Sequence, residues 1–224
     1  MTTKCWVVTG ANRGIGLEIC RQLKLRGDDV VAACRKSSPE LDALGVRVVS
    51  GVEMTSDAAA KAIEAALGDP SKRIDVLLHN AGVLVPDGLE MLDFDAIKKQ
   101  LDVNALGPLR LTKGLLSRLG KGSKIALVSS RAGSIGDNGS GGLYGYRMSK
   151  AALNMAGTSL ARDLAPRGVM VVMLHPGFIR TGMTGGAGND DPPVAAKGLL
   201  TRIDELTPAQ SGKFLHANGE ELPW

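Results

Sequence analysis

Residues 4–16 read KCWVVTGANRGIG, a short apolar run followed by the spaced glycines Gly10, Gly14 and Gly16. The apolar run predicts a buried strand, and Leu17–Leu25 has the apolar spacing of a helix. Gly10 permits a tight exit from the strand, and the next two glycines let backbone amides at a helix start approach a pyrophosphate. The segment therefore predicts a dinucleotide-binding loop in the first strand–helix turn.

Strands and helices alternate along the rest of the chain. Strands are expected at 4–9, 28–34, 46–50, 74–79, 124–130, 169–175 and 213–217. Helices are expected over 17–25, 58–67, 95–119, 146–164 and 194–204. Several strands are apolar without alternation, which is typical of strands buried on both faces of a parallel sheet. The pattern predicts one α/β domain over residues 1–224, a Rossmann-type, doubly wound parallel β-sheet with helices on both faces.

The composition argues against several other classes of protein. The net charge is +4 and aromatic residues make up 3% of the chain, so a nucleic-acid surface is not expected. The three cysteines include no C-x-x-C pair, which favours a reducing compartment. No apolar run reaches the ~20 residues of a membrane span and no signal peptide is visible, so a cytoplasmic protein is expected. The three histidines lack metal-ligand spacing, so no metal site is predicted.

The glycine spacing G-x-x-x-G-x-G resembles that of the short-chain dehydrogenase/reductase family. Further motifs of that family follow in order: Asn80-Ala81-Gly82, Asn104, Ser130, Tyr146 with Lys150, and Pro176-Gly177 with Thr181. His79 stands where the family more often has asparagine. Within the family, the chain looks closest to the branch of C-factor and Sniffer-like carbonyl reductases, on residues 145–154, 175–177 and 219–224. The resemblance spans nearly the whole chain and implies a nicotinamide-dependent oxidoreductase.

A candidate acid–base pair, Tyr146 and Lys150, lies four residues apart on one face of a predicted helix. An ordinary tyrosine has a pKa of about 10, and a nearby ammonium favours the phenolate and lowers that pKa. In carbonyl reduction, Tyr146 would donate a proton to the substrate oxygen as hydride arrives at the carbon. The rival Tyr144 has Met148 at the same spacing, which cannot shift a pKa electrostatically. Tyr146 is therefore the expected general acid.

Ser130 ends a predicted strand at the edge of the sheet where ligands bind, so its hydroxyl can bond the substrate oxygen. Ser129 is expected to point to the opposite side, because strand side chains alternate. The resemblance implies that Lys150 also bonds the nicotinamide ribose. It implies further that Asn104, on a predicted helix, holds a water in a proton relay toward Lys150. The expected catalytic residues are thus Ser130, Tyr146, Lys150 and Asn104.

The end of the second predicted strand, Cys34-Arg35-Lys36, indicates the cofactor. An NAD enzyme commonly has a carboxylate there, which would repel the 2′-phosphate of NADP, whereas cations attract it. Arg13 can reach the same phosphate, so NADP(H) is expected, with NAD(H) as the alternative. Glu53 follows the third strand, where many family members carry aspartate against the adenine. The expected cofactor contacts are Gly10, Asn12, Arg13, Gly14, Ile15, Gly16, Arg35, Glu53, Asn80, Ala81, Gly82, Tyr146, Lys150, Pro176, Gly177, Ile179 and Thr181.

A substrate loop is expected over about residues 178–193, and its glycine-rich part, Thr184–Asp191, predicts a mobile lid over an open pocket. The main hypothesis is an NADPH-dependent reductase of small or varied aldehydes and ketones. The alternatives are an NAD-dependent alcohol dehydrogenase and a nucleotide-binding signalling protein with incidental turnover. A pure sensor has no need of Tyr146 beside Lys150. Family members often pair through long helices, so a homodimer or homotetramer is an open alternative to a monomer.

Overall fold

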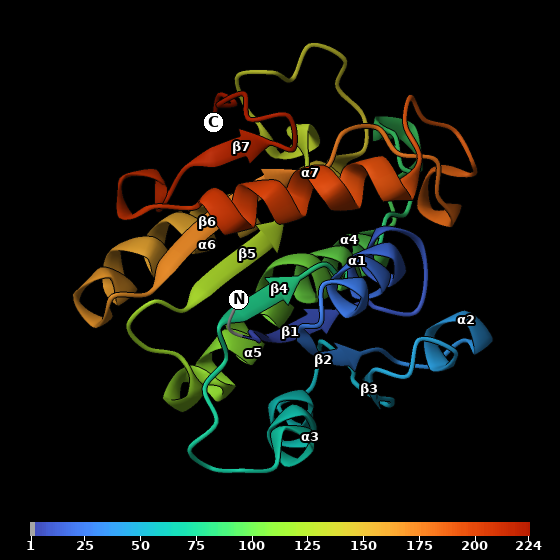
Figure 1. Ribbon diagram of the computed structural model, residues 1–224. Coiled ribbons are helices and arrows are strands. Elements are labelled where there is room, and N and C mark those ends of the chain that lie inside the picture. Colours follow the sequence, from blue (N-terminus) through green and yellow to red (C-terminus); the bar gives the residue numbers. More distant parts are fainter. Residues whose placement is uncertain (1–2) are drawn as a thin grey trace.

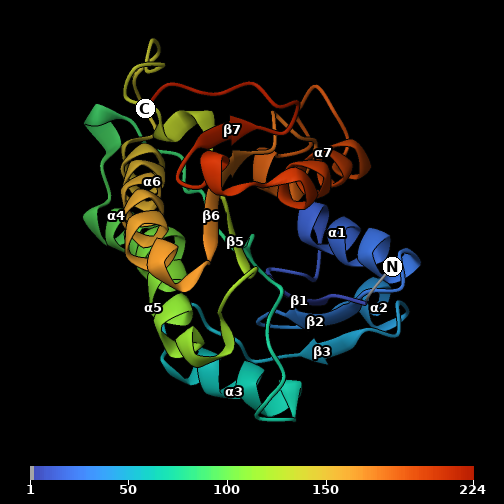
Figure 2. The same cartoon turned by 60° about the vertical axis from the view of Figure 1, so that its left-hand side comes forward.

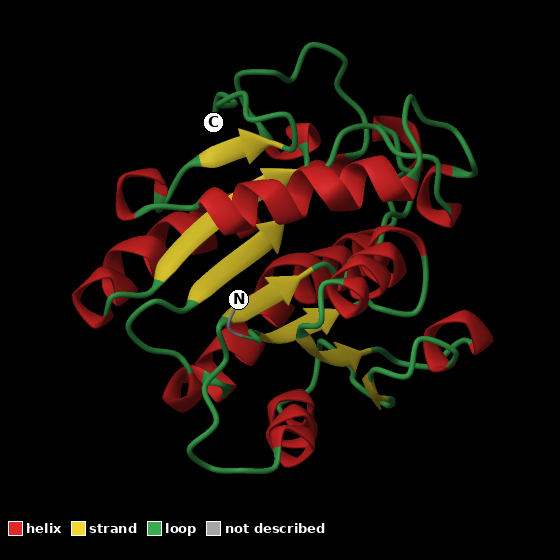
Figure 3. Ribbon diagram, viewed as in Figure 1, coloured by secondary structure: helices red, strands yellow, loops and turns green. Residues whose placement is uncertain are grey.

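The computed structural model describes residues 3–224, which form a seven-stranded parallel sheet in the order β3-β2-β1-β4-β5-β6-β7 (Figures 1 and 3). The strands are β1 (Cys5–Thr9), β2 (Asp29–Ala33), β3 (Arg47–Val49), β4 (Val76–His79), β5 (Lys124–Val128), β6 (Met170–His175) and β7 (Phe214–His216). The order reverses direction between β1 and β4. The predicted doubly wound parallel sheet is confirmed, and such a reversal opens a crevice at the carboxyl ends of the strands.

Helices cover both faces of the sheet, as Figure 2 shows. They are α1 (Gly14–Leu25), α2 (Pro39–Asp42), α3 (Ala58–Leu67), α4 (Phe94–Leu101), α5 (Gly107–Gly114), α6 (Tyr144–Leu164) and α7 (Pro192–Glu205). One face carries α1 and α7, which pack against each other, and the other carries α3 to α6. None of the helices within residues 3–224 is both long and apolar enough to cross a membrane.

Each face of the sheet has its own apolar core, which explains the continuous apolar strands. Leu77 and Leu78 are neighbours on β4, and both are fully buried. Leu77 belongs to the cluster packed against α3, α5 and α6, whereas Leu78 belongs to the cluster packed against α1 and α7. Successive strand residues point to opposite faces, so a sheet covered on both sides needs apolar residues at both parities.

The single helix predicted over 95–119 is wrong, because the structure divides this stretch. A π-helical turn, Asp102–Leu106, separates α4 from α5, and a 3₁₀ turn follows at Leu116–Arg118. Gly107 begins α5 directly beneath Met54, whose backbone oxygen would lie 3.0 Å from an added Cβ. The helix therefore changes pitch where it passes close to the chain after β3. Asn104 lies within this π turn and is buried.

Candidate active site

The glycine loop is held in place by the segment after β4. Gly10 has a left-handed backbone with φ of 65° and lies against Ala81, whose Cα would be 2.8 Å from an added Cβ. Asn80 Nδ2 donates to the backbone oxygens of Thr9 and Gly10, both at 3.1 Å. A Cβ on Gly16 would lie 2.5 Å from that same Nδ2. Asn80 and Ala81 therefore form a brace that fixes the glycine loop in place. Gly16 is needed because any side chain there would collide with Asn80.

Thr9 is a residue of this brace that sequence reasoning missed. Its Oγ1 accepts hydrogen bonds from the backbone N–H groups of Asn80 and Ala81, both at 3.1 Å, and donates to the oxygen of Leu78. The side chain is 1% exposed. A threonine at the end of a buried strand, next to glycine, is the signal that could have found it, because a buried hydroxyl needs partners.

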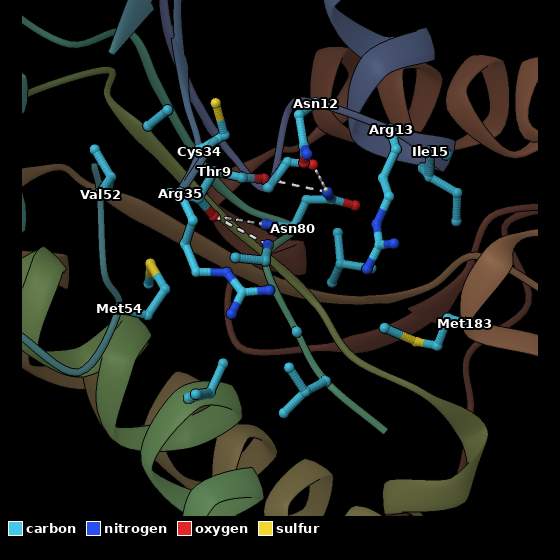
Figure 4. Close-up of a pocket in the computed structure, with 18 of the residues that line it drawn as sticks. Thr9, Asn12, Arg13, Ile15, Cys34, Arg35, Val52, Met54, Asn80 and Met183 are labelled. Atoms are coloured by element: carbon cyan, nitrogen blue, oxygen red, sulfur yellow. Dashed lines mark hydrogen bonds between the residues drawn. The ribbon is translucent and has the colours of Figure 1, made fainter. Parts of the chain in front are cut away.

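A cleft of about 610 Å³ opens above the carboxyl ends of the central strands (Figure 4). The expected cofactor residues that line it are Gly10, Asn12, Arg13, Gly14, Ile15, Arg35, Glu53, Asn80, Ala81, Gly82, Tyr146, Lys150, Pro176 and Thr181. Three of the expected cofactor residues, Gly16, Gly177 and Ile179, and two of the expected catalytic residues, Ser130 and Asn104, are not among the residues that line it. Lining residues that were not expected include Val52, Met54, Lys99 and Val103, whereas Met183 belongs to the expected substrate loop. Lys99 and Val103 are four residues apart on the predicted helix, a spacing that indicates that their side chains lie on the same face.

The charge of the cleft is strongly positive. Its lining carries the cations Arg13, Arg35, Lys36, Lys99 and Lys150, against the single carboxylate of Glu53. Figure 4 shows Arg13 and Arg35 extending into the cleft from the glycine loop and from the end of β2. Among the ion pairs of residues 3–224, neither of these two guanidinium groups takes part. Both can therefore serve a bound anion without losing an internal partner.

Tyr146 and Lys150 both face the inner end of this cleft. Lys150 is 4% exposed, and its Nζ donates to the backbone oxygen of Val128 at 2.8 Å. The same Nζ lies 5.7 Å from the centre of the Tyr146 ring. Burial without an anionic partner lowers the pKa of Lys150 to about 8.

Burial raises the pKa of Tyr146 above its ordinary value, and a hydrogen bond with Ser130 offsets part of that rise. The net shift of the Tyr146 pKa is therefore upward, opposite to the net lowering that the sequence led us to expect. The physical reason is that burial makes the charged phenolate unfavourable. This desolvation penalty is larger than the attraction between the phenolate and the Lys150 ammonium. The phenol consequently carries its proton at neutral pH.

The two neighbouring serines have different partners, as strand alternation predicts. Ser130 lies near the phenol of Tyr146, where its hydroxyl offsets part of the rise in pKa, and its Oγ accepts from the N–H of Ala132 at 3.2 Å. Ser129 is buried and donates to Oδ1 of Asn154 on α6 at 2.6 Å. Ser129 thus ties the strand to the helix, and Ser130 presents the hydroxyl beside the phenol.

Asn104 is fully buried and uses its amide within the protein. Its Nδ2 donates to the oxygen of Val83 and to Oγ of Ser149, at 2.8 and 2.9 Å, and its Oδ1 accepts from the N–H of Val83 at 2.8 Å. The side chain therefore fixes the segment after β4 against α6, a role that the sequence did not predict. The water relay that the resemblance implies stays a prediction.

The loop after β6 is tied at both ends. Asn189 donates its N–H to the oxygen of Phe178 at 2.7 Å, and Arg180 donates its N–H to the oxygen of Asp190 at 2.9 Å. The Arg180 guanidinium also pairs with Asp191 at 2.8 Å. Thr181 and Met183 at its inner side line the cleft. The glycine-rich part predicted as a mobile lid thus has fixed ends, and its motion stays a prediction.

Comparison with known proteins agrees with this site. The family model for short chain dehydrogenases matches residues 4–192. The 1-hydroxy-2-glutathionyl-2-methyl-3-butene dehydrogenase of Rhodococcus sp. (strain AD45) is 44% identical over 97% of this chain and 98% of its own. The C-signal protein of Myxococcus xanthus is 44% identical over 67% of this chain and 93% of its own.

Solved structures give the same result at the level of the fold. The NADPH-bound carbonyl reductase from chicken fatty liver has a TM-score of 0.91 at 28% identity, and the carbonyl reductase Sniffer of D. melanogaster has 0.88 at 27%. Each match covers all of both chains. The chain therefore belongs to the short-chain dehydrogenase family and is an oxidoreductase. Its relatives within that family include C-signal and the Sniffer-like carbonyl reductases.

Proposed function

We propose that the protein is an NADPH-dependent carbonyl reductase in which Tyr146 is the general acid. The observation that carries this proposal is the phenol of Tyr146, with Lys150, in the lining of a strongly cationic, dinucleotide-sized cleft. A phenol that carries its proton can donate it to the oxygen of a carbonyl group as hydride arrives at the carbon. Solved neighbours that bind NADPH support the same reading.

The residues present fit a dinucleotide. Side chains at Gly10 and Gly16 would collide with Asn80 and its neighbours, so both glycines are needed for the loop to keep the shape that lines the cleft. The N-terminus of α1 begins at Gly14, and a helix N-terminus favours a pyrophosphate. Arg13 and Arg35 would hold a 2′-phosphate, which is why NADP(H) is proposed over NAD(H). When bound, the reduced cofactor supplies the hydride.

The protein's own residues then control the proton. Ser130 holds the substrate oxygen beside the phenol, and Tyr146 donates its proton to that oxygen as negative charge develops there. Lys150, with a pKa of about 8, is the nearest cation, and its charge stabilises the phenolate left behind. Reduction is therefore expected to slow above about pH 8, as this ammonium loses its proton.

The second candidate is oxidation of an alcohol. It is favoured by the 44% identity with the 1-hydroxy-2-glutathionyl-2-methyl-3-butene dehydrogenase over nearly the whole chain. The deciding experiment measures kcat/KM in both directions, with NADPH and NADH against a panel of aldehydes, ketones and quinones, and with the oxidised cofactors against the matching alcohols. A clear NADH preference, or turnover in the oxidative direction alone, would contradict the proposal.

The role of Tyr146 is tested by Tyr146→Phe, which removes only the hydroxyl. We expect kcat to fall by about 10²–10⁴-fold, the loss typical of a general acid, while the Kd for NADPH stays within about twofold. The matched control is Tyr144→Phe, on the same helix turn but 37% exposed and outside the cleft lining. Equal activity of the two variants would remove Tyr146 from the mechanism. A biological effect retained by Tyr146→Phe would instead favour the signalling alternative.

A further inference from the structure

The segment Val83–Asp87, after β4, is held along its length by amide side chains of one neighbouring helix. Asn104 pairs with both the N–H and the oxygen of Val83 at 2.8 Å. One turn earlier, Gln100 Oε1 accepts from the N–H of Val85 at 3.0 Å, and its Nε2 donates to the oxygen of Val85 at 3.4 Å. Two side chains that are four residues apart thus hydrogen-bond the backbones of Val83 and Val85, as a neighbouring strand would.

At its far end this segment reaches the catalytic helix. One carboxylate oxygen of Asp87 accepts from the N–H of Tyr144 at 2.5 Å, and the other accepts from the N–H of Gly145 at 2.9 Å. The backbone oxygen of Asp87 accepts from the N–H of Leu143 at 3.2 Å. Three consecutive amides at the start of α6 therefore depend on one residue, 57 positions earlier in the chain.

The helix has no cap of its own. Leu143, at the N-cap position, has a left-handed backbone with φ of 49° and no side-chain oxygen to offer. The first turn of α6 also lacks an acidic residue. The first N–H groups of a helix have no partner within it, so they need an acceptor from outside. Asp87 is that acceptor, and its negative charge also suits the positive end of the helix.

We propose that Asp87 is a positioning residue for the general acid. This inference rests on the proposed function of Tyr146, which lies two residues after Tyr144, the first amide that the Asp87 carboxylate holds. Without that acceptor the first turn of α6 opens, and the phenol loses its fixed place beside Ser130. Lys150 lies one turn deeper and keeps its bond to Val128, so cofactor binding is retained. An error of about 1 Å in the position of a reacting group costs on the order of 10²-fold in rate.

The chain contains a matched control for this role. Asp93, the N-cap residue of α4, accepts from the N–H groups of Asp95 and Ala96 at 2.9 and 3.1 Å, and the first turn that it caps carries no residue of the proposed site. Asp87→Ala and Asp93→Ala each remove one aspartate cap from one helix. We expect similar losses of Tm, but a fall in kcat of at least tenfold in Asp87→Ala only, with the Kd for NADPH within twofold. Asp87→Asn keeps one acceptor oxygen and should recover part of the lost kcat.

Other outcomes separate this inference from the proposed function. Equal kcat in the two alanine variants, or a matching loss of NADPH affinity in Asp87→Ala, would overturn the positioning role. A wild-type protein that reduces no carbonyl compound would refute the proposed function instead. In that case the contact of Asp87 with α6 is tested by amide hydrogen exchange. Exchange should be faster at Tyr144 and Gly145 in the Asp87→Ala variant and unchanged at these two amides in Asp93→Ala. Unchanged exchange at these amides in Asp87→Ala would also overturn the inference.

Discussion

Burial rather than the neighbouring ammonium sets the direction in which the pKa of Tyr146 shifts. The four-residue spacing to Lys150 is visible in the sequence, and the structure brings both side chains to one cleft. The direction of the pKa shift is not visible in the sequence, because it depends on how many atoms from distant segments surround the phenol. The same burial lowers the pKa of Lys150 to about 8. Both shifts have the same cause, because burial disfavours the charged form of each group.

Cofactor preference is decided by single residues, and Arg35 is the one to test. Arg35→Glu replaces attraction of a 2′-phosphate by repulsion, and one close charge pair near a surface is worth on the order of 1–4 kcal/mol. We expect kcat/KM for NADPH to fall by about 10–1,000-fold, with a much smaller change for NADH. Lys61→Glu, an exposed reversal on α3 away from the cleft, makes the same change in net charge and should leave the ratio unchanged. Parallel losses for both cofactors would show that Arg35 does not read the phosphate.

Among the elements, the stretch from α4 to α5 differs most from its sequence pattern. Its apolar spacing predicts a single helix, but hydrogen bonds from Gln100 and Asn104 to Val83–Asp87 and the approach of Met54 divide it. Those partners lie on segments that the local pattern does not include. The close packing of α4 on α6, visible in Figure 2, depends equally on a residue with no side chain, Gly145.

Gly145→Ala should separate these two helices. An added Cβ would lie 2.4 Å from Nε2 of Gln100 and 3.1 Å from Cγ1 of Ile97. Alanine is the better helix former, so any destabilisation must come from this collision. Overpacking of this kind costs about 1–3 kcal/mol, which urea unfolding measures directly. Gly139→Ala, where an added Cβ meets nothing within 4 Å, is the control. A Gly145→Ala protein as stable as wild type would mean that the helices move apart without cost.

At the scale of the whole molecule, two cores share one sheet, so the central strands can hold almost no polar side chain. His79 on β4 is an exception, at 1% exposure. Its Nε2 is hydrogen-bonded to Oγ1 of Thr112 at 3.0 Å, and its Nδ1 has no partner among residues 3–224. Burial lowers its pKa to about 3, so the folded protein holds this ring neutral.

Acid should therefore unfold the protein in part through His79. The pKa of His79 is about 3 in the folded protein, against an ordinary value of 6.5. Below about pH 6.5 the imidazole is therefore protonated in the unfolded chain but stays neutral in the folded protein. Stability is fully present above that pH and falls as the pH drops toward 3. Each such proton contributes a slope of about 1.4 kcal/mol per pH unit. His79→Asn, which does not titrate, should reduce the measured slope between pH 5.5 and 4 by about that amount. Urea unfolding at several pH values checks this, and an unchanged slope would contradict it.

The sequence by itself determined the family, the alternation of strands and helices, the glycine loop and the spacing of Tyr146 and Lys150. Each of these depends on residues close together in the chain, whose spacing reports directly on local geometry. Tertiary structure alone decided that Asp87 caps α6, that Asn104 holds Val83 and that the phenol keeps its proton. These features join residues 21 to 58 positions apart or depend on burial, and neither long-range contact nor desolvation leaves a periodic trace in the sequence.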